Sequence, residues 1–154
     1  MLKHRSERGQ SLVEFALILP IFVLVLAGLF DLGRAVYAYN TISNASREAV
    51  RVAIVNQTAT DVQNEALKQG VALGLSATDV TTTYADPDGS GALCPAPYSL
   101  GCLATVTVQY SYTAATPVIS QIIGPFLMTA TTQMPVERTC PVPADLNLDP
   151  CPWP

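Results

Sequence analysis

The residue in this sequence that most needs a chemical explanation is Glu14, an acid inside an otherwise apolar run. A charge within a membrane segment is costly and usually has a partner, although an acid near the end of a span can also extend to the headgroups. The partner that we consider is an α-amine on Gln10, which cleavage after Gly9 would create at the membrane surface. In a packed bundle, this amine in one subunit would neutralise Glu14 of a neighbour and fix the register of the two helices.

Four cysteines offer a second kind of chemistry. No CxxC pair occurs and the one histidine, His4, precedes the apolar run, so we do not expect a zinc site. An even number of cysteines beyond an export segment indicates disulfides. Three pairings are possible, and free thiols are the alternative. We favour the sequential pairing because it closes the two shortest loops, Cys94–Cys102 and Cys140–Cys151.

Metal binding and catalysis have weaker signals. The loop from Asp86 to Gly91 is similar to the start of a calcium loop, with oxygen-bearing side chains at alternate positions. The bidentate acid that such a loop requires would fall on Pro97, so we expect an ordinary Asp/Gly turn and no metal. Neither a Gly-x-Ser-x-Gly motif nor a phosphate loop occurs. The sequence therefore predicts neither an enzyme nor a bound cofactor.

The apolar run that contains Glu14 extends from Leu12 to Phe30 and is otherwise interrupted only by Pro20 and Gly28. About 20 apolar residues cross the ~30 Å hydrocarbon core of a bilayer, so this is a predicted transmembrane helix. Three Lys and Arg residues precede it with one acid, which predicts a cytoplasmic N-terminus. The predicted organisation is a cytoplasmic leader at 1–11, a transmembrane helix at 12–30 and an extracytoplasmic domain at 31–154.

A cleavable signal peptide is the competing interpretation of the same segment. Val25-Leu26-Ala27 ends in the small residue that signal peptidase prefers. Three observations favour an anchor instead: the acid within the apolar run, Val rather than Ala three residues before the cut, and a helical pattern that continues past Gly28.

The composition excludes two broad classes of protein. Charged residues make up 13% of the chain, compared with about 25% in a typical soluble domain, and 49% of the residues are hydrophobic, which excludes disorder as the main state. Eight Lys and Arg residues against twelve Asp and Glu residues leave no basic footprint for nucleic acid.

Beyond the span, apolar residues continue at helical spacing to about Val55, which predicts one long helix from about Leu12. Its expected apolar stripe is Leu32, Val36, Tyr39, Ile42, Ala45, Ala49, Val50, Ala53 and Ile54. Tyr37 and Tyr39 suit either a membrane-interface anchor or the core.

The rest of the chain predicts a small sheet. A second helix is expected over Thr60–Leu73, capped by Thr60. Alternating apolar and polar residues then predict three strands, with a short helix or turn at 116–125 before the last: 80–85, 103–112 and 127–138. The predicted fold class is α+β, with a three-stranded antiparallel sheet packed on the exported half of the long helix.

The N-terminal residues also carry a family resemblance. The run from Gly9 to Phe15, GQSLVEF, resembles the prepilin-peptidase site of type IV-type pilins, and Phe15 after the glutamate resembles the Flp/Tad branch. The segment over about residues 8–54 resembles the TadE-like pseudopilins of tight-adherence systems. It has their RGQ start, VEFAL, a proline in the span, the exit motif Asp31-Leu32-Gly33-Arg34 and an NAAREGAR-like run at 44–51.

The resemblance implies a minor pilin-like protein that assembles a Flp-type pilus for surface adherence. It implies a processing site formed by Gly9, Gln10, Glu14 and Phe15, and a single-pass location in the bacterial inner membrane. The implied partners are other Tad/Flp assembly proteins, pilin subunits, prepilin peptidase and the lipid bilayer. Asp31 and Arg34 are expected to pair. The alternatives are a membrane-anchored binding module and a secreted protein released after Ala27.

Overall fold

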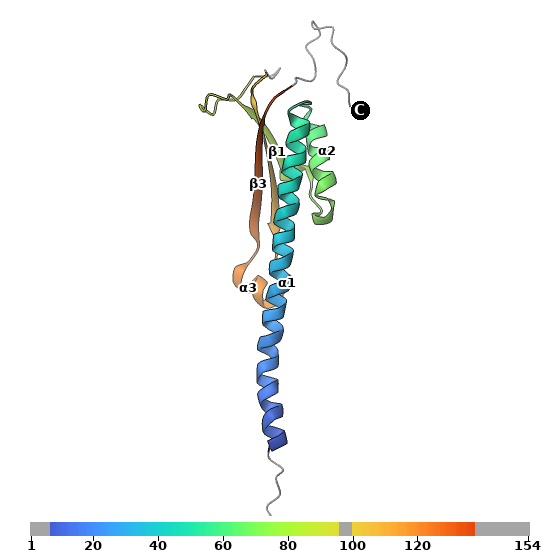
Figure 1. Cartoon of the computed structure of the whole chain (residues 1–154), viewed down its shortest axis with the longest axis vertical. Coiled ribbons are helices and arrows are strands. Elements are labelled where there is room, and N and C mark those ends of the chain that lie inside the picture. The colour runs from blue at the N-terminus through green and yellow to red at the C-terminus, as the bar shows by residue number, and fades with distance from the viewer. Residues whose placement is uncertain (1–6, 96–99, 138–154) are drawn as a thin grey trace, which may run out of the picture. The chain divides into compact units, whose positions relative to one another are not determined.

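The computed structural model describes residues 7–95 and 100–137 and has the predicted α+β class (Figure 1). The main elements, in chain order, are α1 (Glu7–Ala53), α2 (Ala59–Gln69), β1 (Val80–Ala85), β2 (Leu103–Tyr112), α3 (Pro117–Ile123) and β3 (Phe126–Pro135). Two short 3₁₀ turns, Val71–Leu73 and Ala77–Asp79, lie between α2 and β1.

These elements form two compact units, which are described separately. The first contains the chain up to Val36 together with Thr113–Pro125, so it comprises the N-terminal part of α1 and all of α3. The second contains Tyr37–Tyr112 and the chain from Phe126, so it comprises the rest of α1, α2 and the sheet.

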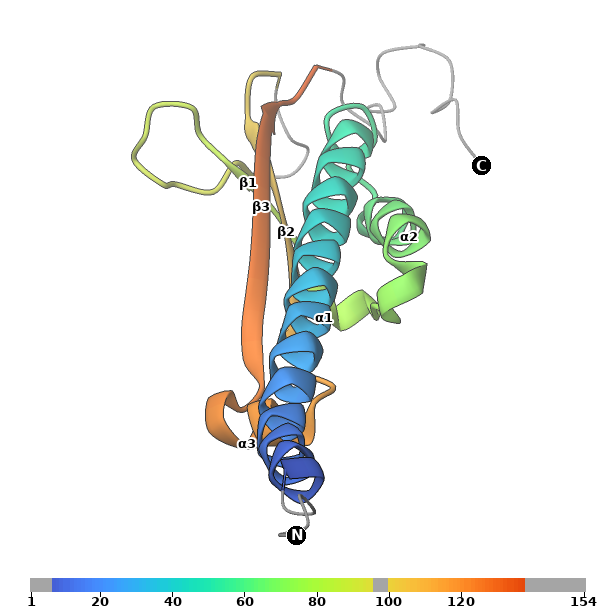
Figure 2. The same cartoon turned by 60° about the horizontal axis from the view of Figure 1, so that its bottom comes forward.

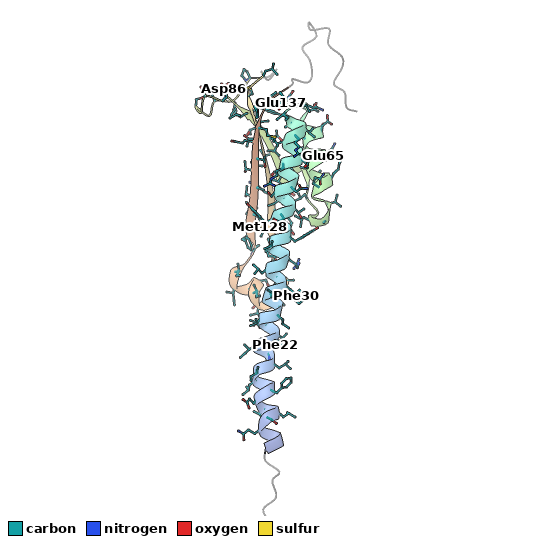
Figure 3. All side chains as sticks on the ribbon, in the orientation of Figure 1. Phe22, Phe30, Glu65, Asp86, Met128 and Glu137 are labelled. Atoms are coloured by element: carbon teal, nitrogen blue, oxygen red, sulfur yellow. A yellow bond between two sulfur atoms is a disulfide. The ribbon has the colours of Figure 1, made fainter. Side chains whose placement is uncertain are left out.

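In the first unit, α1 presents apolar side chains on every face. All side chains from Leu12 to Leu26 are exposed, as are Leu29 and Phe30, and Phe22 and Phe30 project from the helix in Figure 3. Pro20 lies inside the helix without ending it. Among the described residues, α1 is the one helix that is long and apolar enough to cross a membrane. It is consistent with single-pass anchoring.

The second unit is built on an antiparallel sheet in the order β1-β2-β3. Val108, in the central strand, pairs with Val80 on one side and Ala130 on the other. These three residues are buried, and they share one core with Ile42 of α1 and Val62 of α2. The core therefore lies between the sheet and the two helices, as the alternation of the strands predicts.

The buried stripe of α1 in the second unit agrees largely with the predicted one and includes two further residues. Ile42, Ala45, Ala49, Val50 and Ala53 are buried as expected, and Ala38 and Ser46 are buried as well. Tyr37 and Tyr39 are exposed, so neither is a core residue. Most of the buried side chains are small, which lets the strands approach the helix closely. Ser46 Oγ lies 2.8 Å from Thr132 Oγ1 of β3.

The element ends differ slightly from the predictions. Helix α2 ends at Gln69, and Thr60 does not cap it: Thr58 occupies the cap position without a side-chain capping bond. Asn56 orders this turn, because its Oδ1 accepts a hydrogen bond from Thr58 N at 3.0 Å and its Nδ2 donates to Asp61 Oδ2 at 2.7 Å. Strand β3 lies at an edge of the sheet and ends at Pro135, as expected for a residue that has no N–H for a ladder.

Candidate functional site

The residues of the predicted processing site lie in the first turns of α1. Gly9, Gln10 and Glu14 are exposed, and so is Phe15. Gln10 and Glu14 are four positions apart, so both side chains lie on one face of the helix. Within the described residues, Glu14 makes no hydrogen bond or ion pair. A cut after Gly9 would place a cationic amine at the positive end of the helix dipole, where a carboxylate is stabilising.

Asp31, at the end of the predicted span, has partners that sequence reasoning did not find. The residue is 6% exposed. Oδ1 accepts a hydrogen bond from Ala115 N at 2.8 Å and Oδ2 accepts one from Thr116 N at 3.0 Å. The predicted partner Arg34 is also present, with Nη1 3.6 Å from Asp31 Oδ1, but its side chain is 56% exposed. The main role of this acid is therefore to hold the chain that leads into α3.

Asp31 anchors the chain immediately before α3. Thr116 occupies the N-cap position and Pro117 the first turn, as predicted, yet the Thr116 side chain makes no capping bond. The two N–H groups that Asp31 accepts belong to Ala115 and Thr116, which precede the first helical residue, Pro117. Asp31 therefore fixes the entry into α3 from a distant position in the chain, which the local sequence pattern could not show.

A second contact joins α3 to α1 one turn earlier. Ile119 Cδ1 lies 3.5 Å from the position that a Cβ on Gly28 would occupy. This is an ordinary van der Waals distance, so Ile119 packs beside Gly28, and both views show α3 and α1 side by side (Figures 1 and 2). The unit formed by α1 and α3 is held at Asp31 by hydrogen bonds and at Gly28 by packing.

The predicted Cys94–Cys102 disulfide is confirmed, with a Cα–Cα distance of 6.4 Å. Cys140 and Cys151 lie outside the described residues. Asp86 Oδ1 lies 3.3 Å from Cys94 Sγ, so one carboxylate and two sulfurs are clustered. Because both sulfurs are bonded to each other, neither is the thiolate that a metal would need.

The loop after β1 is the Asp/Gly turn that the sequence predicts. Asp86 N donates to Ala92 O at 2.8 Å, and Ser90 N donates to Asp88 Oδ1 at 2.9 Å. Hydrogen bonds from the Ser90 hydroxyl and then from its backbone N–H hold the pKa of Asp88 below its usual value. The carboxylate of Asp88 is thus used within the turn.

A groove in the second unit lies between the C-terminal part of α1 and α2. Its lining includes the apolar residues Val52, Val55, Leu67 and Val71 and the members of two ion pairs. Arg51 Nη1 lies 3.2 Å from Glu48 Oε1, and Lys68 Nζ lies 3.0 Å from Glu65 Oε2. The Lys68 ammonium lowers the pKa of Glu65. These four charges are paired with one another, as in a solvated helix surface.

Comparison with known proteins gives one match. Residues 9–51 match the family model described as TadE-like protein, so the predicted resemblance is confirmed over that segment. No curated protein and no solved structure matches the chain. The matched segment covers the exposed Gly9–Gln10 bond, the apolar part of α1, Asp31 and most of the helix that packs on the sheet.

Proposed function

We propose that this chain is a minor pilin-like subunit that acts in the assembly of a Flp/Tad-type pilus and has no catalytic activity of its own. A prepilin peptidase cuts it after Gly9. The observation that carries the proposal is that the family match and the features of a processing site fall in the same segment. The TadE-like match covers residues 9–51. Within it, an exposed Gly9–Gln10 bond precedes an apolar helix with Glu14 at the fifth position of the mature chain.

The proposed location is the bacterial inner membrane, with the N-terminus in the cytoplasm. The leader has an excess of basic residues, whereas the chain after residue 30 has ten acids and five Lys and Arg residues. Helix α1 continues without a break through Ala27 and Gly28 to Ala53. This continuity favours an anchored subunit over a protein released by signal peptidase after Ala27.

The proposed assembly step pairs two charges in adjacent subunits. The apolar surface of α1 from Leu12 to Leu26 has no covering within its unit, so it is available to lipid or to neighbouring helices. Glu14 is the one charged side chain in this apolar run. An amine on Gln10 of one subunit and Glu14 of the next would neutralise each other in a medium where a lone charge is costly. The pairing would set the axial offset between helices.

The test uses cells that make the pilus and carry single substitutions in this chain. Glu14→Ala and Glu14→Gln remove the charge, and Glu7→Gln makes the same chemical change in the proposed leader. We expect all three variants to be processed, but only Glu7→Gln to support normal pilus numbers by electron microscopy. Normal piliation with Glu14→Ala would contradict charge pairing, and normal piliation without this chain would contradict the assembly role.

A further inference from the structure

Helix α3 presents apolar side chains away from its own unit. Val118 is 47% exposed, Ile122 78% and Ile123 63%. Val118 and Ile122 are four residues apart, so they lie on one face of the helix. Exposed apolar side chains gathered on one short element mark an interaction surface more often than scattered ones do.

The contacts with α1 fix where this surface lies along the apolar helix. Asp31 binds the backbone just before α3, and Ile119 packs beside Gly28. The apolar run ends at Phe30, between these two positions of α1. In Figures 1 and 3, which share one orientation, α3 lies beside α1 close to Phe30.

The apolar surface of α3 is therefore continuous with that of α1. Leu29 and Phe30, in the last turn of the apolar run, are 65% and 75% exposed. The chain has no charged residue between Gly89 and Val136, a stretch that includes α3 and its flanking turns. Arg34 is the one cation in the last turns of α1 in this unit and follows the apolar run. No charge on α3 opposes contact with lipid.

We propose that α3 is a second membrane-contacting element, which inserts Val118, Ile122 and Ile123 into the boundary between headgroups and acyl chains on the outer side of the bilayer. The inference rests on the proposed anchoring of α1. Amphipathic helices at a bilayer surface lie in this boundary, with the apolar face buried by about 5–10 Å. The loop between β2 and β3 thereby becomes a contact between the exported part of the chain and the bilayer.

The position of α3 at the end of the apolar run indicates that its apolar surface contacts lipid rather than a second copy of the chain. Any subunit anchored by α1 carries α3 at the end of its own span, whichever subunits surround it. The Asp31 carboxylate, which would be costly near lipid, is satisfied by two backbone N–H groups and by Arg34. This arrangement lets an acid lie beside an apolar surface at the edge of the bilayer.

The experiment places one tryptophan probe at a time in the full chain. Trp153, the sole native tryptophan, is first replaced by Phe. The test probe is Ile122→Trp, the control within the span is Phe22→Trp, and the control in the second unit is Val71→Trp, whose native side chain is 74% exposed. Each protein is reconstituted in phosphatidylethanolamine and phosphatidylglycerol vesicles with bromine-labelled phosphatidylcholine, which quenches tryptophan in contact with acyl chains.

We expect quenching at position 122 comparable to that at position 22 and several-fold greater than that at position 71. Quenching at 22 with none at 122, together with access of aqueous iodide to the probe at 122, would overturn the lipid contact and leave the anchor intact. Shielding at 122 that disappears on dilution into more lipid would assign the surface to a second copy and would also overturn it. Loss of quenching at 22 would contradict the anchor itself.

Discussion

Asp31 Oδ2 accepts a hydrogen bond from the backbone nitrogen of Thr116 at 3.0 Å, although the two residues are 85 positions apart in the chain. A carboxylate that follows the apolar run therefore organises a turn between two strands. Asp31, which lies within the segment that matches the family model, thus has a structural role in this chain. It holds α3 against α1 within the first unit.

Asp31→Asn should loosen this attachment. The oxygen of the Asn amide can accept a hydrogen bond from one of the two backbone N–H groups. The NH₂ group of the amide then faces the other N–H, which loses its acceptor. We expect the amide hydrogens of Ala115 and Thr116 to exchange faster by about tenfold or more, measured by hydrogen exchange on the full chain in lipid nanodiscs.

Arg34→Gln is the matched control for this change. Its guanidinium is mostly exposed and lies 3.6 Å from the carboxylate, and exposed ion pairs contribute little. The same two amides should then exchange within about threefold of the unsubstituted rate. Equal protection in both variants would show that Asp31 does not hold α3.

The Cys94–Cys102 disulfide should contribute measurably to the stability of the second unit. It joins residues separated by eight positions, and replacing both by serine should lower the free energy of unfolding by about 2–3 kcal/mol. Urea unfolding followed by circular dichroism measures the change. A peptide map without reductant is the direct check: a peptide that links Cys94 to any other cysteine would contradict the pairing.

The small residues of α1 that face the core should not tolerate large side chains. Ala49 is fully buried, so Ala49→Leu should cost about 1–3 kcal/mol through overpacking. Arg47, on the exposed face of the same helix turn, is the control, and Arg47→Leu should stay within about 0.5 kcal/mol. Equal unfolding midpoints in urea for the two variants would contradict the packing described for this face.

The Ser46–Thr132 hydrogen bond should couple α1 to β3. A double-mutant cycle with Ser46→Ala and Thr132→Val should give a coupling of about 0.5–1.5 kcal/mol, because Ser46 is buried and the hydroxyls are 2.8 Å apart. The exposed Thr107–Thr131 pair, at 3.1 Å, is the comparison. Its coupling should be near zero because water replaces the lost partner. Similar couplings for both pairs would mean that burial does not strengthen the first.

Local patterns predicted most of the fold. The alternation in β2 correctly indicates that Val106 and Val108 face the core, and Pro117 and Gly124 bound α3 as expected. The buried stripe of α1 was predicted less well. Apolar spacing pointed to Leu32 and Val36, which are exposed, whereas Ala38 and Ser46 are buried. Leu32 and Val36 belong to the first unit, whereas Ala38 and Ser46 belong to the second unit, which contains the sheet. Periodicity alone does not show which turns of a long helix a sheet covers.

The Asp31 contact could not be predicted from sequence because it joins segments that are distant in the chain. Spacing on one helix suggested Arg34 as its partner, and that pair is present. Its other partners are the Thr116 side chain and the backbone N–H groups of Ala115 and Thr116, and every residue except proline carries such an N–H. Nothing in a sequence distinguishes the two that lie within reach of the carboxylate.

The measurement that tests the central proposal most directly is the intact mass and N-terminal sequence of the mature protein from the cell membrane. Processing by a prepilin peptidase predicts a chain that begins at Gln10. A chain that begins at Gly28 would show release by signal peptidase, and one that begins at Met1 would show an unprocessed anchor. Either of these two results would contradict the proposed pilin-like processing.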